Sequence, residues 1–149
     1  MARFRYRMQS ILDIKEKLEN QARQELAAAQ MALNEELARL EALEERKAGY
    51  EAEAAGLLSG TLKILDIEEN KEAILKMEEY IILQQGRVHV AEKQVEKARE
   101  RLQEVMQERK MHEKLKEHAF EEFLEEEKKQ EGKEVDELTS YTYGQKKKV

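Results

Sequence analysis

The side chains that most often act in catalysis or metal binding are few in this chain. Their spacing does not match the catalytic and metal-binding motifs in which they usually occur. Histidine occurs only at His89, His112 and His118. His112-Glu113 begins like the H-E-x-x-H zinc motif, but the next histidine lies six residues on. That spacing turns a helix by about 240° and separates the two rings. His118 and Glu122 are spaced to share a metal weakly, and a solvated pair is the commoner outcome, so we expect no metal site.

Other catalytic and cofactor-binding patterns are missing. The chain has no cysteine, which excludes disulfides, thiolate metal sites and a cysteine nucleophile. It contains neither a P-loop nor a dinucleotide-binding glycine pattern. Carboxylates are abundant, but two packed helices offer no cleft that would desolvate a catalytic pair. The sequence therefore predicts a protein that is not an enzyme and binds no cofactor.

The composition indicates long helices around a thin apolar core. Of the 149 residues, 40% are Asp, Glu, Lys or Arg, against about 25% in typical soluble domains. There are three Phe, five Tyr, no Trp and no Pro, a balance typical of coiled coils. The longest apolar runs cover only a few residues, as at 81–83. We therefore expect no membrane-spanning segment and no signal peptide.

The charge is unevenly placed along the chain. Residues 1–17 carry a net charge of +3, and the three lysines at 146–148 add another +3. Because the total is −6, residues 18–144 hold −12. So acidic a body argues against binding nucleic acid, whose affinity comes largely from phosphate neutralisation. The basic ends suit an acidic partner or an anionic lipid surface.

Apolar residues in the first part of the chain recur at steps of three and four, the spacing of one helix face. From Phe4 to Leu40 the steps average 3.6 residues, which predicts a nearly straight helix. Lys15 fills the one position that lacks an apolar residue. The stripe consists of Phe4, Met8, Ile11, Leu18, Ala22, Leu26, Ala29, Leu33, Leu37, Leu40 and Leu43, and Tyr50, Ala54 and Leu57 extend it.

A second stripe follows a heptad repeat. Its first series is apolar and mostly β-branched, and the series three positions later is mixed, as expected for the a and d positions of a coiled coil. Arg109 and His112 occupy the next turn of the seam, where polar residues set register or mark a change of packing. The a series is Ile67, Ile74, Ile81, Val88, Val95 and Leu102; the d series is Asn70, Met77, Gln84, Ala91, Ala98 and Val105.

These stripes predict an all-α fold, with two long helices forming an antiparallel coiled-coil hairpin over residues 1–131. We expect helix 1 at about 3–57, a turn at about 58–65 around Gly56 and Gly60, and helix 2 at about 66–131 with Asp66 near its N-cap. We expect residues 132–149 to form an acidic, then basic, partly ordered tail. Antiparallel folding would place the N-terminal arginines beside the glutamates of residues 113–125, where they would form surface salt bridges. A parallel self-dimer is the alternative.

Several apolar and aromatic residues near the turn lie off the expected seam. They include Tyr50, Tyr80, Ile82 and Leu83. One interpretation is that the tyrosines cover the seam edges and Ile82 is simply exposed. The other is a docking patch near the turn, because exposed apolar clusters on a highly charged helix are often contact sites.

Three segments together resemble the FliJ family of flagellar export proteins. Residues 4–15, FRYRMQSILDIK, alternate aromatic and basic residues before a leucine-rich helix. Residues 94–102, QVEKARERL, resemble the family's second helix, and residues 133–138, KEVDEL, resemble its closing acidic segment. With the chain's length, central break and lack of cysteine, the resemblance covers essentially the whole sequence.

The resemblance implies a non-enzymatic coiled coil of the bacterial flagellar type III export apparatus. Such proteins resemble the stalk of rotary ATPases. They associate with the hexameric export ATPase and with the membrane export gate protein, and they help to deliver export chaperones and substrates. The expected location is cytoplasmic, peripheral to the inner face of the cell membrane at the flagellar base.

The resemblance also assigns candidate contacts. The ATPase-ring candidates are Arg3, Arg5, Arg7, Lys146, Lys147 and Lys148. The export-gate candidates are Leu43, Tyr50, Met77, Tyr80, Ile81 and Gln84. Arg46 stands where the family can carry an aromatic residue in this patch.

The rival interpretation is a self-associating structural coiled coil, or a holdase-like chaperone, without an ATPase partner. The regular heptads of residues 67–102 would also suit a parallel dimer. A nucleic-acid-binding helical hairpin fits less well because the body of the chain is acidic.

Overall fold

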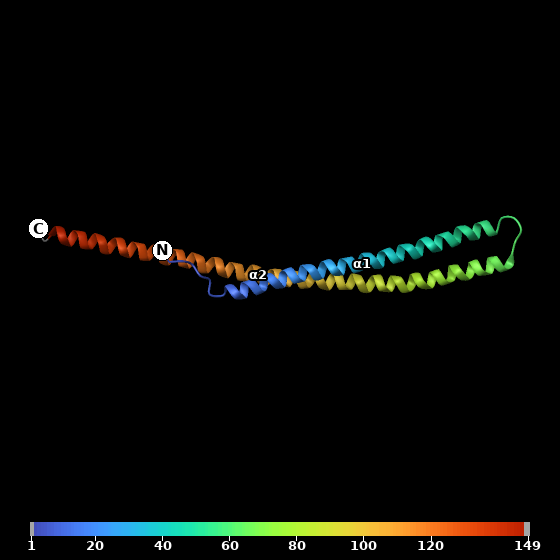
Figure 1. Ribbon diagram of the computed structural model, residues 1–149, viewed down its shortest axis with the longest axis horizontal. Helices are drawn as coiled ribbons and strands as arrows, with labels where there is room; N and C mark the ends of the chain where they lie inside the picture. The colour runs from blue at the N-terminus through green and yellow to red at the C-terminus, as the bar shows by residue number, and fades with distance from the viewer. Residues whose placement is uncertain (1, 148–149) are drawn as a thin grey trace. The chain divides into compact units, whose positions relative to one another are not determined.

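The chain folds into two long α-helices packed against each other as a hairpin, which confirms the predicted fold class (Figure 1). The computed structural model describes residues 2–147, and side chains as far as residue 144. Helix α1 spans Gln9–Leu57 and helix α2 spans Ile64–Lys147. The chain divides into two compact units, Met1–Asn20 with Glu104–Val149, and Gln21–Gln103.

In the unit Gln21–Gln103, the α2 heptads form the seam against α1. The d series is buried at Asn70, Met77, Gln84 and Ala91, and the a series at Val88 and Val95. The other a and d residues of this unit are half-buried. One residue of the predicted α1 stripe in this unit does not lie in the seam. Leu37 is 43% exposed, whereas Glu36 is half-buried beside Gln84.

Polar side chains in this seam bond across it to main-chain oxygens. Asn70 Nδ2 donates to the carbonyl oxygen of Tyr50 at 2.9 Å, and Gln84 Nε2 donates to that of Glu36 at 2.9 Å. Gln84 also donates to the Glu36 carboxylate. Since a buried amide without a partner is costly, each bond favours one register of α1 against α2.

The turn between the helices contains the one residue of the described chain with a positive φ. Gly60 has φ of 96°, a conformation that favours glycine. Ser59 closes the end of α1 by donating from Oγ to the carbonyl oxygen of Gly56 at 2.9 Å. Helix α2 starts two residues earlier than predicted, so Asp66 lies in its first turn, where a carboxylate interacts favourably with the helix dipole.

In the other unit, the start of α1 packs against α2 from residue 104 onward. Leu12 and Val105 are buried here. Lys15, which interrupts the apolar stripe, forms an ion pair with Glu108 at 2.8 Å. Arg109 bonds to the buried carboxylate of Glu19.

Arg109 and His112 are the polar seam residues of this unit. Arg109 also pairs with Glu113 at 2.9 Å, and its pKa is raised above the ordinary value by the hydrogen bonds to Glu19 and then Glu113. His112 Nδ1 is buried and has no hydrogen-bond partner among the described residues. The predicted polar seam is therefore present, with one satisfied ion pair and one unsatisfied imidazole nitrogen.

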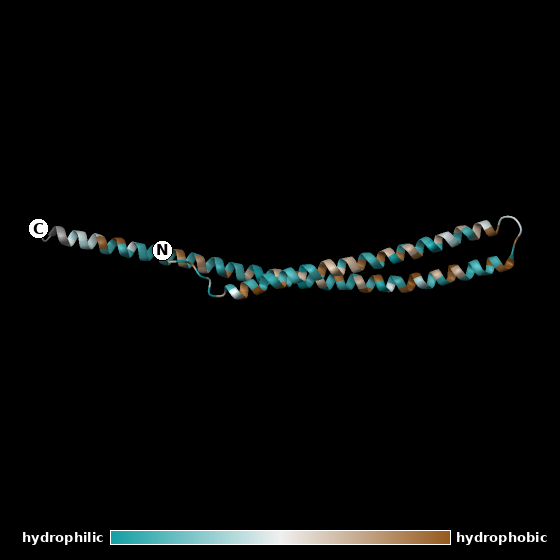
Figure 2. Cartoon of the chain, in the orientation of Figure 1, coloured by the Kyte–Doolittle hydropathy of each residue, from teal (hydrophilic) through white to brown (hydrophobic). Residues whose placement is uncertain are grey.

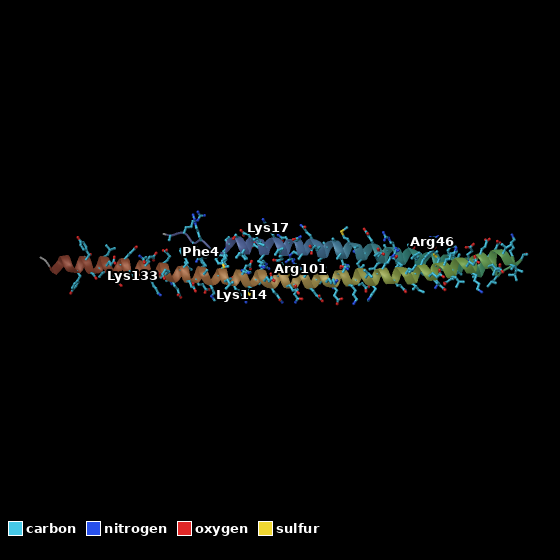
Figure 3. All side chains as sticks on the ribbon, turned by 90° about the horizontal axis from the view of Figure 1, so that it is seen from below. Phe4, Lys17, Arg46, Arg101, Lys114 and Lys133 are labelled. Carbon is cyan, nitrogen blue, oxygen red and sulfur yellow. The ribbon has the colours of Figure 1, made fainter. Side chains whose placement is uncertain are left out.

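The N-terminal residues are not helical, which corrects the prediction that helix 1 begins near residue 3. Residues 2–6 have no regular secondary structure, and α1 begins at Gln9. Phe4 packs on Phe120 with ring centroids 5.1 Å apart and on Phe123 at 5.4 Å (Figure 3). Extended chain advances about 3.3 Å per residue, against 1.5 Å in a helix. This longer reach lets Phe4 meet two α2 rings.

The C-terminal prediction also needs correction, because α2 continues to Lys147 rather than ending near residue 131. Residues 128–144 are exposed, so packing does not explain this helix. Residues 128–138 have no proline and are rich in Glu and Lys, which favour helix, whereas residues 139–144, TSYTYG, are weaker helix formers. The loss of the apolar stripe after residue 130 therefore does not mark the end of the helix.

The turn geometry gives a first prediction. Replacing Gly60→Ala places a Cβ at positive φ and should lower the free energy of unfolding by about 1 kcal/mol. Gly49→Ala is the matched control, because Gly49 lies within α1 and a Cβ there meets nothing within 4 Å. It should stabilise the protein by up to about 1 kcal/mol. Urea unfolding followed by circular dichroism measures both; equal effects would contradict the turn assignment.

The Glu19–Arg109 pair gives a second prediction. Glu19→Leu and Arg109→Leu should each lower the Tm, because each leaves one seam charge without this partner. The double variant should lie closer to wild type than either single variant. Thermal circular dichroism, with amide hydrogen exchange over residues 104–120, measures the cycle. Additive losses would mean that the two side chains act independently.

Candidate functional site

The ATPase-ring candidates near the N-terminus alternate with aromatic residues in the non-helical segment before α1. Arg3, Arg5 and Arg7 are exposed, while Phe4 and Tyr6 between them are half-buried. Successive side chains of an extended chain point to opposite sides, so the aromatic rings attach the segment to α2 and the arginines remain outward. The alternation of aromatic and basic residues has a period of two, which is the sequence signal for this non-helical start.

The three arginines do not form the expected salt bridges with the acidic part of α2. Within the described residues, none of them is ion-paired to a carboxylate. The contact that holds the segment is aromatic: Phe4, Phe120 and Phe123 form a cluster whose two α2 rings are 6.4 Å apart. The arginines are therefore available as a basic surface. Lys146, Lys147 and Lys148, the remaining ring candidates, lie outside the residues whose side chains are described.

The export-gate candidates differ in how much surface they present. Met77 is 6% exposed and Gln84 is 5% exposed, because both belong to the d series of the seam. Three others are half-buried at the seam edge: Leu43, Tyr50 and Ile81. Tyr80 is 48% exposed. In the hairpin, a partner would reach Tyr80 and the seam-edge residues, whereas Met77 and Gln84 are buried in the seam.

Tyr50 contributes to an open groove beside the turn. The groove is also lined by Leu57 of α1 and by Asp66 and Glu69 of α2. It therefore combines apolar side chains with carboxylates. Such a mixed surface suits a partner with a basic or amide-rich segment next to an apolar residue.

A further group of exposed apolar residues on α2 was only partly anticipated. Ile82 and Leu83 were noted as off-seam residues, and they are 67% and 65% exposed. Leu75 and Val90, at 51% and 60% exposure, were missed. Figure 2 shows apolar residues along this part of α2. The available signal was their spacing from Ile82 and Leu83 at seven or eight residues, about two helical turns.

The described residues contain no metal-binding cluster of three or more His, Cys, Asp or Glu side chains. His118 lies 3.7 Å from Glu121 rather than pairing with Glu122. Neither described helix is long and apolar enough to cross a membrane. The described residues offer a partner three surfaces: the exposed arginines, the groove beside the turn and the exposed apolar residues of α2.

Comparison with known proteins identifies the family. No curated protein sequence matches the chain significantly. Among solved structures, a protein from Chlamydia trachomatis described as the YscO homolog CT670 matches with a TM-score of 0.77 and 22% identity over 99% of each chain. This likeness establishes a shared fold. A profile of the family described as flagellar FliJ protein matches residues 4–148. The chain therefore belongs to the FliJ family, the non-catalytic coiled-coil components of the flagellar type III export apparatus.

Proposed function

We propose that this protein is a stalk-like partner of the hexameric flagellar export ATPase and links it to the membrane export gate. The observation that carries the proposal is the N-terminal segment, which presents Arg3, Arg5 and Arg7 outward while Phe4 and Tyr6 pack inward. Three cations at fixed spacing suit the acidic lining of a protein ring. Family membership supplies the export apparatus as the setting.

The mechanism requires no chemistry from this chain. A stiff helical element in the pore of a ring alters the balance of subunit states if it contacts those states differently. The outward arginines, and the lysines at 146–148, provide such contacts. Nucleotide hydrolysis takes place entirely within the ATPase, and the chain changes only its rate.

The gate-facing surface lies near the turn in this proposal. Tyr80 is its most exposed member, and Leu43, Tyr50 and Ile81 flank it at the seam edge. Met77 and Gln84 are buried in the seam and present little surface to a partner. Contact with the gate would place the protein at the inner face of the cell membrane, and the same surfaces would receive export chaperones and their substrates.

The alternative is a self-associating structural coiled coil or a general holdase chaperone. The exposed apolar residues of α2 favour this reading, because such surfaces bind other copies or unfolded chains. The alternative differs from the main proposal in one respect that is simple to measure. It predicts no effect on the export ATPase.

The ATPase contact is tested by reversing the three arginine charges together, with Arg3, Arg5 and Arg7 replaced by Glu. Binding to the ATPase of the same organism should weaken by about tenfold or more, and stimulation of hydrolysis should fall with it. The matched control replaces three exposed cations of the other unit by Glu, namely Arg46, Lys76 and Arg87. Equal losses in both triple variants would remove the N-terminal arginines from the interface.

The gate contact is tested by Tyr50→Ala combined with Tyr80→Ala. Affinity for the cytoplasmic domain of the gate protein should fall by about tenfold, because tyrosines near the centre of an interface often contribute 1–2 kcal/mol or more. The α-helical circular dichroism should be unchanged. Met31→Ala, at an exposed α1 position, should bind as wild type. Unaltered affinity of the tyrosine variant would show that both rings only cover the seam edge.

A further inference from the structure

The exposed apolar residues of α2 belong to a longer stripe on the side of the helix that faces away from α1. At 100° per residue, its members fall within a sector of about 100°, centred about 160° from the buried seam. All of them are exposed. We call this the outer stripe, and it consists of Ile64, Leu65, Glu68, Glu72, Leu75, Glu79, Ile82, Leu83, Gly86, Val90, Lys93, Lys97, Glu100 and Arg101.

The outer stripe has a charge gradient along its length. Its N-terminal part carries Glu68, Glu72 and Glu79, and its centre is apolar. Its C-terminal part is net basic, with Lys93, Lys97 and Arg101 and one carboxylate, Glu100. The central apolar side chains are between half and two-thirds exposed. This order is complementary to that of a second copy in the opposite direction. When two copies lie antiparallel, the acidic part of each stripe meets the basic part of the other.

The positions match as well as the charges. About the midpoint between Ile82 and Leu83, Leu75 is as far on one side as Val90 is on the other. The same holds for Glu72 with Lys93, and for Glu68 with Lys97. Two antiparallel copies would thus bring Leu75 level with Val90, and two carboxylates level with two ammonium groups. Only at the ends do apolar residues meet charged ones, Ile64 with Arg101 and Leu65 with Glu100. Parallel copies would instead oppose like charges.

Gly86 provides an independent observation. It interrupts α2 at a cost in helix stability, yet a Cβ at this position would meet nothing within 4 Å in the hairpin. Nothing inside the described chain therefore requires a glycine here. In the antiparallel arrangement Gly86 lies level with Glu79 of the partner copy, and the missing side chain allows the two helices to approach closely.

From these features we infer that the outer stripe is a binding surface for a second copy of this chain, joined antiparallel through α2. The contact spans residues 64–101, about 55 Å of helix, and its core is formed by Leu75, Ile82, Leu83 and Val90. It uses neither the N-terminal arginines nor the gate-facing tyrosines, so it is independent of the proposed function.

The oligomeric state is measured with the full-length protein by sedimentation equilibrium. Up to about 100 µM at low salt, the mass should rise from 17.5 kDa towards twice that value, as for a Kd near the micromolar range. Ile82→Glu should weaken the dimer at least tenfold. The control Met31→Glu places the same charge at an exposed α1 position and should leave it intact. A monomeric wild type, or equal losses in both variants, overturns the inference.

Charge reversal tests the pairing itself. Glu68→Lys with Glu72→Lys should weaken the dimer, and so should Lys93→Glu with Lys97→Glu. All four changes in one chain should restore it, because each end again meets its opposite charge. A simple loss of helix stability would not be rescued in this way. Failure of the fourfold variant to dimerise overturns the antiparallel arrangement.

Disulfide cross-linking distinguishes an antiparallel from a parallel dimer. Because the native chain has no cysteine, only the introduced cysteines can form disulfides. A mixture of the Leu75→Cys and Val90→Cys proteins should form a mixed disulfide readily. Leu75→Cys alone should not, since two such residues in antiparallel copies are about 22 Å apart along the helix. The reverse result would show a parallel dimer and overturn the inference.

Discussion

The structure depends on one narrow line of contact between α1 and α2. No large side chain among the described residues is completely buried, so each seam residue contributes only part of the free energy of full burial. In so thin a core, a shift of α1 by one turn would exchange apolar neighbours for similar ones. Asn70, Gln84 and Arg109 make such a shift costly, because each would leave its bonding partner across the seam.

The seam could be predicted because its pattern is local to each helix. A repeat of seven residues from Ile67 to Leu102 specifies the buried face of α2 whatever the partner is. The exchange of Leu37 for Glu36 on α1 could not be predicted in the same way. It depends on a hydrogen bond from Gln84, and sequence periodicity carries no information about which residue lies opposite.

Helical periodicity in the sequence gives the wrong helix boundary at both ends of the chain. At the N-terminus, Phe4 fits a helical stripe by spacing but belongs to an extended segment, because the contact with Phe120 and Phe123 requires the longer reach. At the C-terminus, the apolar stripe ends near residue 130 but the helix continues to Lys147. Burial and helix formation are separate properties, because α2 continues through residues whose side chains are exposed. The candidate gate residues illustrate a related difficulty: Met77 and Gln84 fit both the seam and the patch by spacing, and only the structure gives their burial.

The N-terminal segment shows how a protein without catalytic groups can act on an enzyme in the proposed role. A contact that is equally strong in every state of a ring changes no equilibrium between those states. The contacts of the arginines must therefore depend on the positions of their partners. Arg3 and Arg5 lie in a segment without regular secondary structure, and Arg7 lies in the turn before α1. The packing of Phe4 on two α2 rings limits the freedom of this segment before any partner arrives. The entropy lost in ordering this segment is therefore part of folding and not of binding. Small movements of the partner carboxylates would then change the contact energy directly.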